Sequence, residues 1–253
     1  MNLKLSALAA AALMAAGSAH ADIALPSSGD GSLFFSLWDE NGSYTFDMNT
    51  LISQFETKIA EGGPVHMVWD LSADSVLGAF LASADLATLR WNIVAADGVG
   101  ARRLLTTYTE PKADPTQTND VMRSAVGYVE DFQIYVNENL PDDDSAASIA
   151  VNSASQAWAG KEIFSDTLGS LLNFSNAAGV NGMMGFMRID AKATGIANSL
   201  YNTYLDDGVA VTALYGDDNM LYLTAQPVPE ADTWAMMLAG LGLVGMMARR
   251  RTA

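Results

Sequence analysis

The chain contains no cysteine and only two histidines among its 253 residues. Without cysteine it has no disulfide, no thiol nucleophile, no thiolate metal site and no iron–sulfur cluster. One histidine, His20, lies in an N-terminal segment that we expect to be removed, which leaves His66. Zinc or copper sites built from several histidines are therefore excluded, and haem ligation is disfavoured.

Basic residues are also scarce. The chain has 13 Lys and Arg against 29 Asp and Glu. Residues 22–226 keep nine of these bases and 27 of these acids, which gives that part a formal net charge of −18. Nucleic acid is excluded as a partner, because binding to phosphate is built on Lys and Arg. An acidic surface of this kind keeps a protein soluble and self-repelling, or alternatively binds divalent cations.

The sequence contains no assembled catalytic set. A Ser-His-Asp site would depend on His66, which lies inside an apolar stretch, and no Gly-x-Ser-x-Gly turn is present. We expect His66 to be a strand residue on the less buried face. Two facing carboxylates of a glycosidase cannot be singled out among 27 acids. The sequence therefore predicts a protein that is not an enzyme.

The C-terminal segment contains a long uncharged run. Residues 233–248 lack any charge, and Arg249, Arg250 and Arg251 follow them. As a helix the run would be about 24 Å long, slightly short of a hydrocarbon core of about 30 Å. Trp234 suits one membrane interface and the arginines suit the cytoplasmic one. We expect a transmembrane helix, with the rest of the chain on the far side of the membrane from the cytoplasm.

The N-terminus is typical of a secretory signal peptide. Lys4 precedes an apolar stretch, and Ala19 and Ala21 form the small-x-small pattern of a cleavage site. Cleavage by signal peptidase after Ala21 would leave Asp22 as the first residue. The sequence therefore divides into a signal peptide over 1–21, an exported domain over 22–226, and a C-terminal segment over 227–253.

The C-terminal segment resembles the PEP-CTERM protein-sorting signal of Gram-negative bacteria. The order of motif, apolar run, arginines and chain end carries the resemblance, on Val228, Pro229, Glu230, residues 233–248 and Arg249, Arg250 and Arg251. Ala231 stands where the commoner form has a second proline, so the motif is the variant Val-Pro-Glu-Ala. The resemblance implies processing by an exosortase, a membrane-embedded thiol transpeptidase often found in species that make exopolysaccharide. It gives this chain no catalytic residue, because the chain is the substrate.

The exported part has the pattern of a β-rich α+β domain. Hairpin signals at Asn41-Gly42, Asp97-Gly98 and 216–219 join runs with strand periodicity. The strands that we expect are 33–39, 44–48, 65–71, 88–96, 102–109, 183–189, 209–215 and 221–225. Helices are expected over 73–84, 119–140 and 145–158, and the second of these has a clear apolar stripe. The order predicts an antiparallel β-sandwich or curved sheet with a central helical insertion.

Two kinds of ligand site remain open in the exported part. Acidic turns offer oxygen ligands to calcium, although none matches an EF-hand, and the candidates are Asp142, Asp144, Asp206 and Asp217. Strand aromatics are more often core residues, but they also form platforms that stack on sugars. The aromatic candidates are Trp38, Tyr44, Trp69, Trp91 and Tyr108.

The leading hypothesis is a non-enzymatic structural or surface protein associated with exopolysaccharide. We expect it to be held transiently in the inner membrane, with the domain over 22–226 in the periplasm, and to reach the outer surface or the extracellular matrix. Its expected partners are signal peptidase, exosortase, the inner membrane and exopolysaccharide, and it needs no cofactor beyond the calcium alternative. A glycan-binding module is the first alternative, and a polysaccharide-active enzyme is the second.

Overall fold

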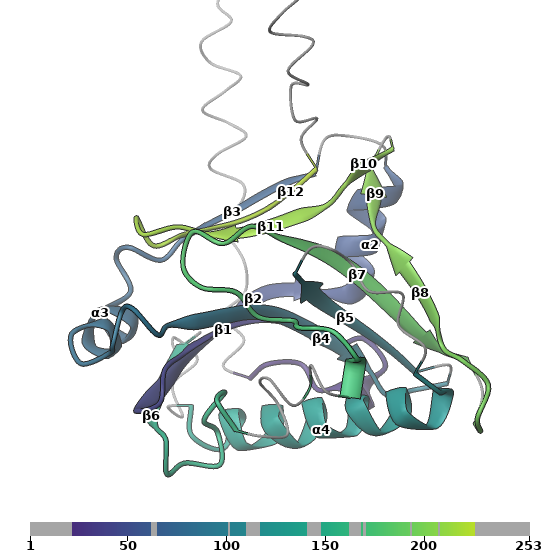
Figure 1. Cartoon of the computed structure of the whole chain (residues 1–253), viewed down its shortest axis with the longest axis horizontal. Coiled ribbons are helices and arrows are strands. Elements are labelled where there is room, and N and C mark those ends of the chain that lie inside the picture. Colours follow the sequence, from purple (N-terminus) through teal and green to yellow (C-terminus); the bar gives the residue numbers. More distant parts are fainter. Residues whose placement is uncertain are drawn as a thin grey trace, which may run out of the picture.

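The protein folds around one curled antiparallel sheet, seen in the computed structural model in Figure 1. The structure describes residues 22–61, 65–100, 102–109, 117–140, 148–161, 168, 171–192, 194–206 and 208–225. Ten strands form the sheet in the order β3-β12-β11-β7-β5-β4-β1-β2-β6, with β8 paired to β7, and a separate small hairpin joins β9 to β10. A curved sheet, one of the two predicted architectures, is therefore confirmed.

The elements follow one another with short connections in most places. The strands are β1 Ser32–Trp38, β2 Gly42–Leu51, β3 His66–Asp70, β4 Arg90–Asp97, β5 Arg102–Tyr108, β6 Ser148–Asn152, β7 Met184–Ala191, β8 Leu200–Thr203, β9 Leu205–Asp206, β10 Val209–Ala210, β11 Thr212–Tyr215 and β12 Met220–Thr224. The helices are the short 3-10 helix η1 Pro26–Ser28, and α2 Ile52–Ala60, α3 Ser75–Leu81 and α4 Asn119–Asn137.

The predicted hairpins form where turn residues were found. Asp39 closes the turn between β1 and β2, because its Oδ1 accepts hydrogen bonds from the main-chain N–H groups of Asn41 (2.8 Å) and Gly42 (2.9 Å). The pairs β4–β5 and β11–β12 are antiparallel neighbours, as their turn signals predicted. These three hairpins supply six of the strands in the sheet.

The central strands of the sheet are buried on both faces. Along β1, Phe35 belongs to the core on the concave face, whereas Phe34 belongs to the core on the face that α4 covers. The ring of Phe34 stacks on Phe132 of α4 at 5.8 Å between centroids. Consequently every residue of β1 is buried, which explains why its sequence is an almost continuous apolar run.

The curl brings distant strands into contact across the concave face. Phe35 in β1 lies 4.9 Å from Tyr215 in β11, measured between ring centroids. Three strands separate β1 from β11 in the sheet order. Helices α2 and α3 lie at the two ends of this concave face, and α4 lies beneath the opposite face (Figure 1).

Two parts of the fold differ from the sequence prediction. The helix expected over 145–158 is wrong, because Ser148–Asn152 form β6 and pair with β2 at the edge of the sheet. Tertiary context overrides the helix propensity of the alanines in this segment, because Ile149 gains burial by facing the α4 core. The prediction also missed helix α2 and strands β8 and β9.

No helix in the described part of the chain is long and apolar enough to span a membrane. The helix expected over 233–248 lies outside the described residues.

Candidate functional site

The C-terminal segment follows β12, the second strand from one edge of the sheet. Ala225, the last described residue, is only 3% exposed, and its N–H donates a hydrogen bond to the carbonyl of Val65 at 2.9 Å. It follows β12, which lies between β3 and β11. The residues around this exit, Val65, Ala225 and the hairpin β9–β10, are called the tail root below.

Asp206 connects hairpin β9–β10 to the tail root. Its Oδ2 accepts a hydrogen bond from the N–H of Val65 at 2.7 Å, so Val65 contacts Asp206 and Ala225 through its two main-chain groups. Asp206 is 5% exposed, and its Oδ1 is buried without a hydrogen-bond partner. Figure 1 shows the hairpin beside α2 and the adjoining ends of β3 and β12.

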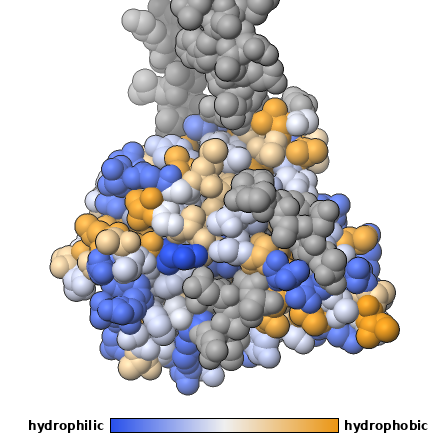
Figure 2. Space-filling model, viewed as in Figure 1, coloured by the Kyte–Doolittle hydropathy of each residue, from blue (hydrophilic) through white to orange (hydrophobic). Residues whose placement is uncertain are grey.

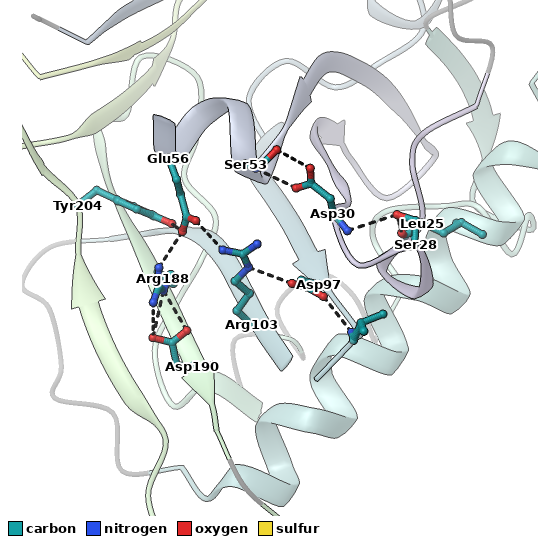
Figure 3. Close-up of polar contacts among 11 residues, drawn as sticks. Leu25, Ser28, Asp30, Ser53, Glu56, Asp97, Arg103, Arg188, Asp190 and Tyr204 are labelled. Atoms are coloured by element: carbon teal, nitrogen blue, oxygen red, sulfur yellow. Dashed lines mark hydrogen bonds and ion pairs between the residues drawn. The ribbon is translucent and has the colours of Figure 1, made fainter. Parts of the chain in front are cut away.

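A network of charged side chains holds the base of this hairpin (Figure 3). Glu56 of α2 is its centre, since Oε1 accepts hydrogen bonds from Nη1 of Arg188 at 2.9 Å and from the hydroxyl of Tyr204 at 2.8 Å. Its Oε2 forms an ion pair with Nη1 of Arg103. Helix α2 is thereby tied to β5, to β7 and to the residue that precedes β9.

Both arginines of the network are also bound to a second carboxylate. Arg103 Nε donates to Asp97 at 3.1 Å, and Arg188 makes a bidentate contact with Asp190 through Nε (2.9 Å to Oδ1) and Nη2 (2.9 Å to Oδ2). The side chains of Arg103, Arg188 and Glu56 are 21–32% exposed, so water reaches part of the network.

The surroundings of the network shift two pKa values upward. Burial lowers the pKa of Arg188, but hydrogen bonds to Asp190 and Glu56 outweigh burial, and the pKa is raised overall. Burial, reinforced by the negative charge of Glu56, raises the pKa of Tyr204 well above its ordinary range. Arg188 therefore stays charged and Tyr204 stays protonated.

The geometry of this network suits a structural role. Each guanidinium already contacts two carboxylates, so neither presents an unpaired fork to an anionic ligand. Glu56 has both oxygens occupied by donors, which does not suit an acid or a base that must exchange a proton. The network positions Tyr204, and through it the strand that carries Leu205.

A cavity lies at the opposite end of the β11–β12 hairpin. Its volume is about 430 Å³, and it is lined by Leu81, Leu86, Leu89, Val180, Asn181, Tyr215, Gly216, Asp217 and Asn219. In the register of β11 and β12, Thr212 pairs with Thr224 next to Ala225, whereas Tyr215 pairs with Leu221 next to the turn. The cavity and the tail root are therefore at different ends of the β11–β12 hairpin.

The structure separates the candidate calcium ligands. Asp206 binds the N–H of Val65 at the tail root, whereas Asp217 is exposed at the β11–β12 turn, where its own N–H donates to Asn181. Asp142 and Asp144 lie outside the described residues. Within the described ranges, no three Asp, Glu, His or Cys side chains come together as a metal site.

The candidate aromatic platform is not formed by the strands. Trp38, Tyr44, Trp91 and Tyr108 are at most 5% exposed and belong to the two cores. Trp69 is half-buried and donates its indole N–H to the carbonyl of Met48. These five residues do not make a flat exposed surface.

The remaining predicted site residues mostly lie outside the described part. Val228, Pro229, Glu230, Ala231, Arg249, Arg250 and Arg251 of the sorting signal are among them, as are Ala19 and Ala21 of the cleavage site. Asp22 is the first described residue and is exposed. His66 is exposed in β3, as predicted.

Sequence reasoning missed the role of Asp206 and its neighbour Leu205. The Asp-Asp-Gly turn at residues 206–208 was the available signal, and it indicated a turn or a cation ligand. The contact between Asp206 and Val65 spans 141 positions of sequence. No local pattern indicates such a contact.

Comparison with known proteins gives one match. No curated protein and no solved structure matches the chain. A family model, the PEP-CTERM protein-sorting motif, matches residues 227–251. The match begins two residues after Ala225 and confirms the resemblance on which export and processing by an exosortase at the membrane were expected. The chain thus carries a C-terminal PEP-CTERM protein-sorting motif.

Proposed function

We propose that the chain is a non-enzymatic surface or matrix protein, delivered to the cell envelope or to an exopolysaccharide-rich biofilm matrix. In this proposal residues 1–21 direct export and residues 233–248 span the inner membrane. An exosortase then processes the segment near Pro229 and Glu230. The observation that carries the proposal is the match of the sorting motif to residues 227–251.

The described domain supports a structural role rather than a catalytic one. Its largest charged cluster, around Glu56, has its donors and acceptors occupied by one another. Its only described histidine, His66, is exposed at the start of β3. A net charge of −18 over residues 22–226 suits a protein that stays soluble at a crowded surface.

A reporter fusion tests this function. Residues 226–253 are fused to a periplasmic reporter and expressed with and without an exosortase, and the size of the product is followed on a blot. We expect processing only when the exosortase is present. The matched control replaces Pro229 and Glu230 by Ala, which should leave the fusion full-length. Exosortase-independent processing, or none at all, would contradict the proposal.

Glycan binding is a second candidate function, and the cavity of about 430 Å³ favours it. Leu86 and Val180 contribute apolar side chains to the lining, and Asn181 and Asn219 contribute amide groups. Apolar contact combined with polar groups suits a neutral sugar. Glycan-array binding by the purified chain, abolished in Leu86→Arg, would support this function. If no glycan on the array binds the chain, glycan binding is excluded as its function.

A further inference from the structure

The distance between the domain and the membrane is limited by the length of the chain between them. Ala225 is fixed in the fold by its hydrogen bond to Val65, and the uncharged run begins at residue 233. The intervening residues reach at most about 28 Å when fully extended, at roughly 3.5 Å per residue. While the run is in the bilayer, the tail root must therefore stay close to the membrane surface.

The hairpin β9–β10 presents an apolar side chain at this exit. Leu205 is 54% exposed, and Ala210 is its partner across the hairpin. Hydrophobic residues gather at the corner of the surface in Figure 2 where Figure 1 shows this hairpin. Residues 194–205 contain no charged residue, although the domain as a whole is strongly acidic.

Neighbouring residues fix the direction in which Leu205 points. Tyr204 packs edge-on against Phe55 at 5.0 Å between centroids, and its hydroxyl binds Glu56. Asp206 turns inward to the N–H of Val65. Because successive side chains of an extended segment alternate, Leu205 is directed outward between these two inward residues.

We propose that hairpin β9–β10 is a lipid-contact site, which inserts Leu205 into the outer face of the membrane while the chain is attached through its C-terminal segment. This inference rests on the membrane attachment in the proposed function. The contact is apolar rather than electrostatic, because an acidic domain gains nothing from anionic lipid. A leucine beside a fixed anchor needs little further affinity, since the anchor holds it at high effective concentration.

The absence of cysteine makes a direct test simple. The full chain with Leu205→Cys is labelled with a fluorophore and reconstituted in phosphatidylcholine liposomes that contain nitroxide-labelled lipid. The matched control is Leu86→Cys. Leu86 is 64% exposed in the wild type and lines the cavity at the turn end of the β11–β12 hairpin, away from the tail root. We expect quenching at position 205 to exceed that at position 86 by about twofold or more, since interfacial side chains penetrate about 5–10 Å.

The outcomes separate the inference from the proposed function. If both variants float with the liposomes and position 205 is quenched no more than position 86, the lipid contact is wrong and the attachment stands. If neither variant floats with the liposomes, the attachment fails and the inference fails with it. If position 205 is unquenched in liposomes but crosslinks to the exosortase in cells, the hairpin binds the enzyme, which overturns the lipid contact. Circular dichroism of each variant confirms that the exposed substitution leaves the fold intact.

Discussion

The indole N–H of Trp69 in β3 donates a hydrogen bond to the main-chain carbonyl of Met48 in β2 at 3.1 Å. The two strands lie near opposite ends of the sheet order. Strand β6 covers β2 only from Gly42 to Phe46, so the carbonyl of Met48 lies beyond that pairing. The Trp69 side chain thus links β3 to β2 across the curled sheet. In the described residues, no main-chain hydrogen bonds pair these two strands.

Replacing Trp69 by Phe should therefore lower the free energy of unfolding by more than a comparable substitution at an exposed aromatic residue. The indole donor is lost while most of the ring is kept, and one such hydrogen bond contributes about 1 kcal/mol to the free energy of unfolding. Urea unfolding followed by circular dichroism measures the difference. Tyr128→Phe, at a residue that is 37% exposed on α4, is the control. Equal midpoints for the two variants would show that the Trp69 hydrogen bond does not stabilise the curl.

Glu56→Gln should destabilise the domain, because two arginines and Tyr204 lose a charged acceptor. The pairs are partly exposed, so the expected loss is about 1–2 kcal/mol rather than the larger value of a fully buried pair. Chemical denaturation at low and high salt measures it. Glu61→Gln, at the exposed end of α2, should change the unfolding free energy little. A loss of the same size in both variants would contradict a specific role for the network.

The parts of the fold that the sequence predicted are those specified locally. Turn residues such as Asp39 and the apolar stripe of α4 act within a few residues of one another, so periodicity and turn chemistry reveal them. Strand β6 depends instead on the free edge of β2, which lies about a hundred residues earlier in the chain. Helix α2 begins directly after β2 without a Gly or Pro to mark the boundary.

The candidate site was predictable only in part, for the same reason. The sorting motif is a contiguous pattern, and the family model confirms it over residues 227–251. The tail root and the charged network beside it are assembled from residues far apart in the sequence. Asp206 and Val65 of the tail root are separated by 141 positions, and Tyr204 and Glu56 of the network by 148. Pairing over such distances is set by the completed fold, so no residue spacing in the sequence predicts it.

The domain should lose stability as the pH is lowered past about 4, and Asp39 accounts for part of this loss. Burial raises the pKa of Asp39, but hydrogen bonds from the main chain of Asp85, Asn41 and Gly42 outweigh burial, and the pKa is lowered from 3.8 overall. A carboxylate with a lowered pKa stabilises the fold above its unfolded pKa, and this contribution is lost as the pH falls through the folded pKa.

Urea midpoints measured between about pH 2 and pH 7 test this dependence. Asp39→Asn cannot titrate, so its stability should decline less steeply in acid than that of the wild type. Asp30→Asn serves as a control, because Asp30 is a half-buried carboxylate that binds Ser53 away from this turn. Parallel curves for Asp39→Asn and the wild type would exclude Asp39 as a source of the acid sensitivity.

Asp206→Ala should loosen the tail root. The buried N–H of Val65 would lose its acceptor, and an unsatisfied buried donor costs about 1–3 kcal/mol. Hydrogen exchange should become faster at Val65 and across β9–β10, with little change in α4. Asp217→Ala is the matched control, because Asp217 is exposed at the other end of the β11–β12 hairpin. Unchanged exchange at Val65 in Asp206→Ala would show that this carboxylate does not hold the hairpin.

The arginines that end the sorting motif should act as a group. Replacing only Arg250 by Ala leaves two positive charges to hold the short uncharged run at the cytoplasmic side, so processing should continue. Replacing Arg249, Arg250 and Arg251 together removes that bias, and the run then slips through or inserts inverted. We expect processing near Pro229 and Glu230 to be lost. The thermal midpoint of the domain should stay unchanged, because the hydrogen bonds and core contacts described above lie within residues 22–225. The size of the product on a blot distinguishes the two variants, and normal maturation of the triple variant would show that the arginines are not the stop signal.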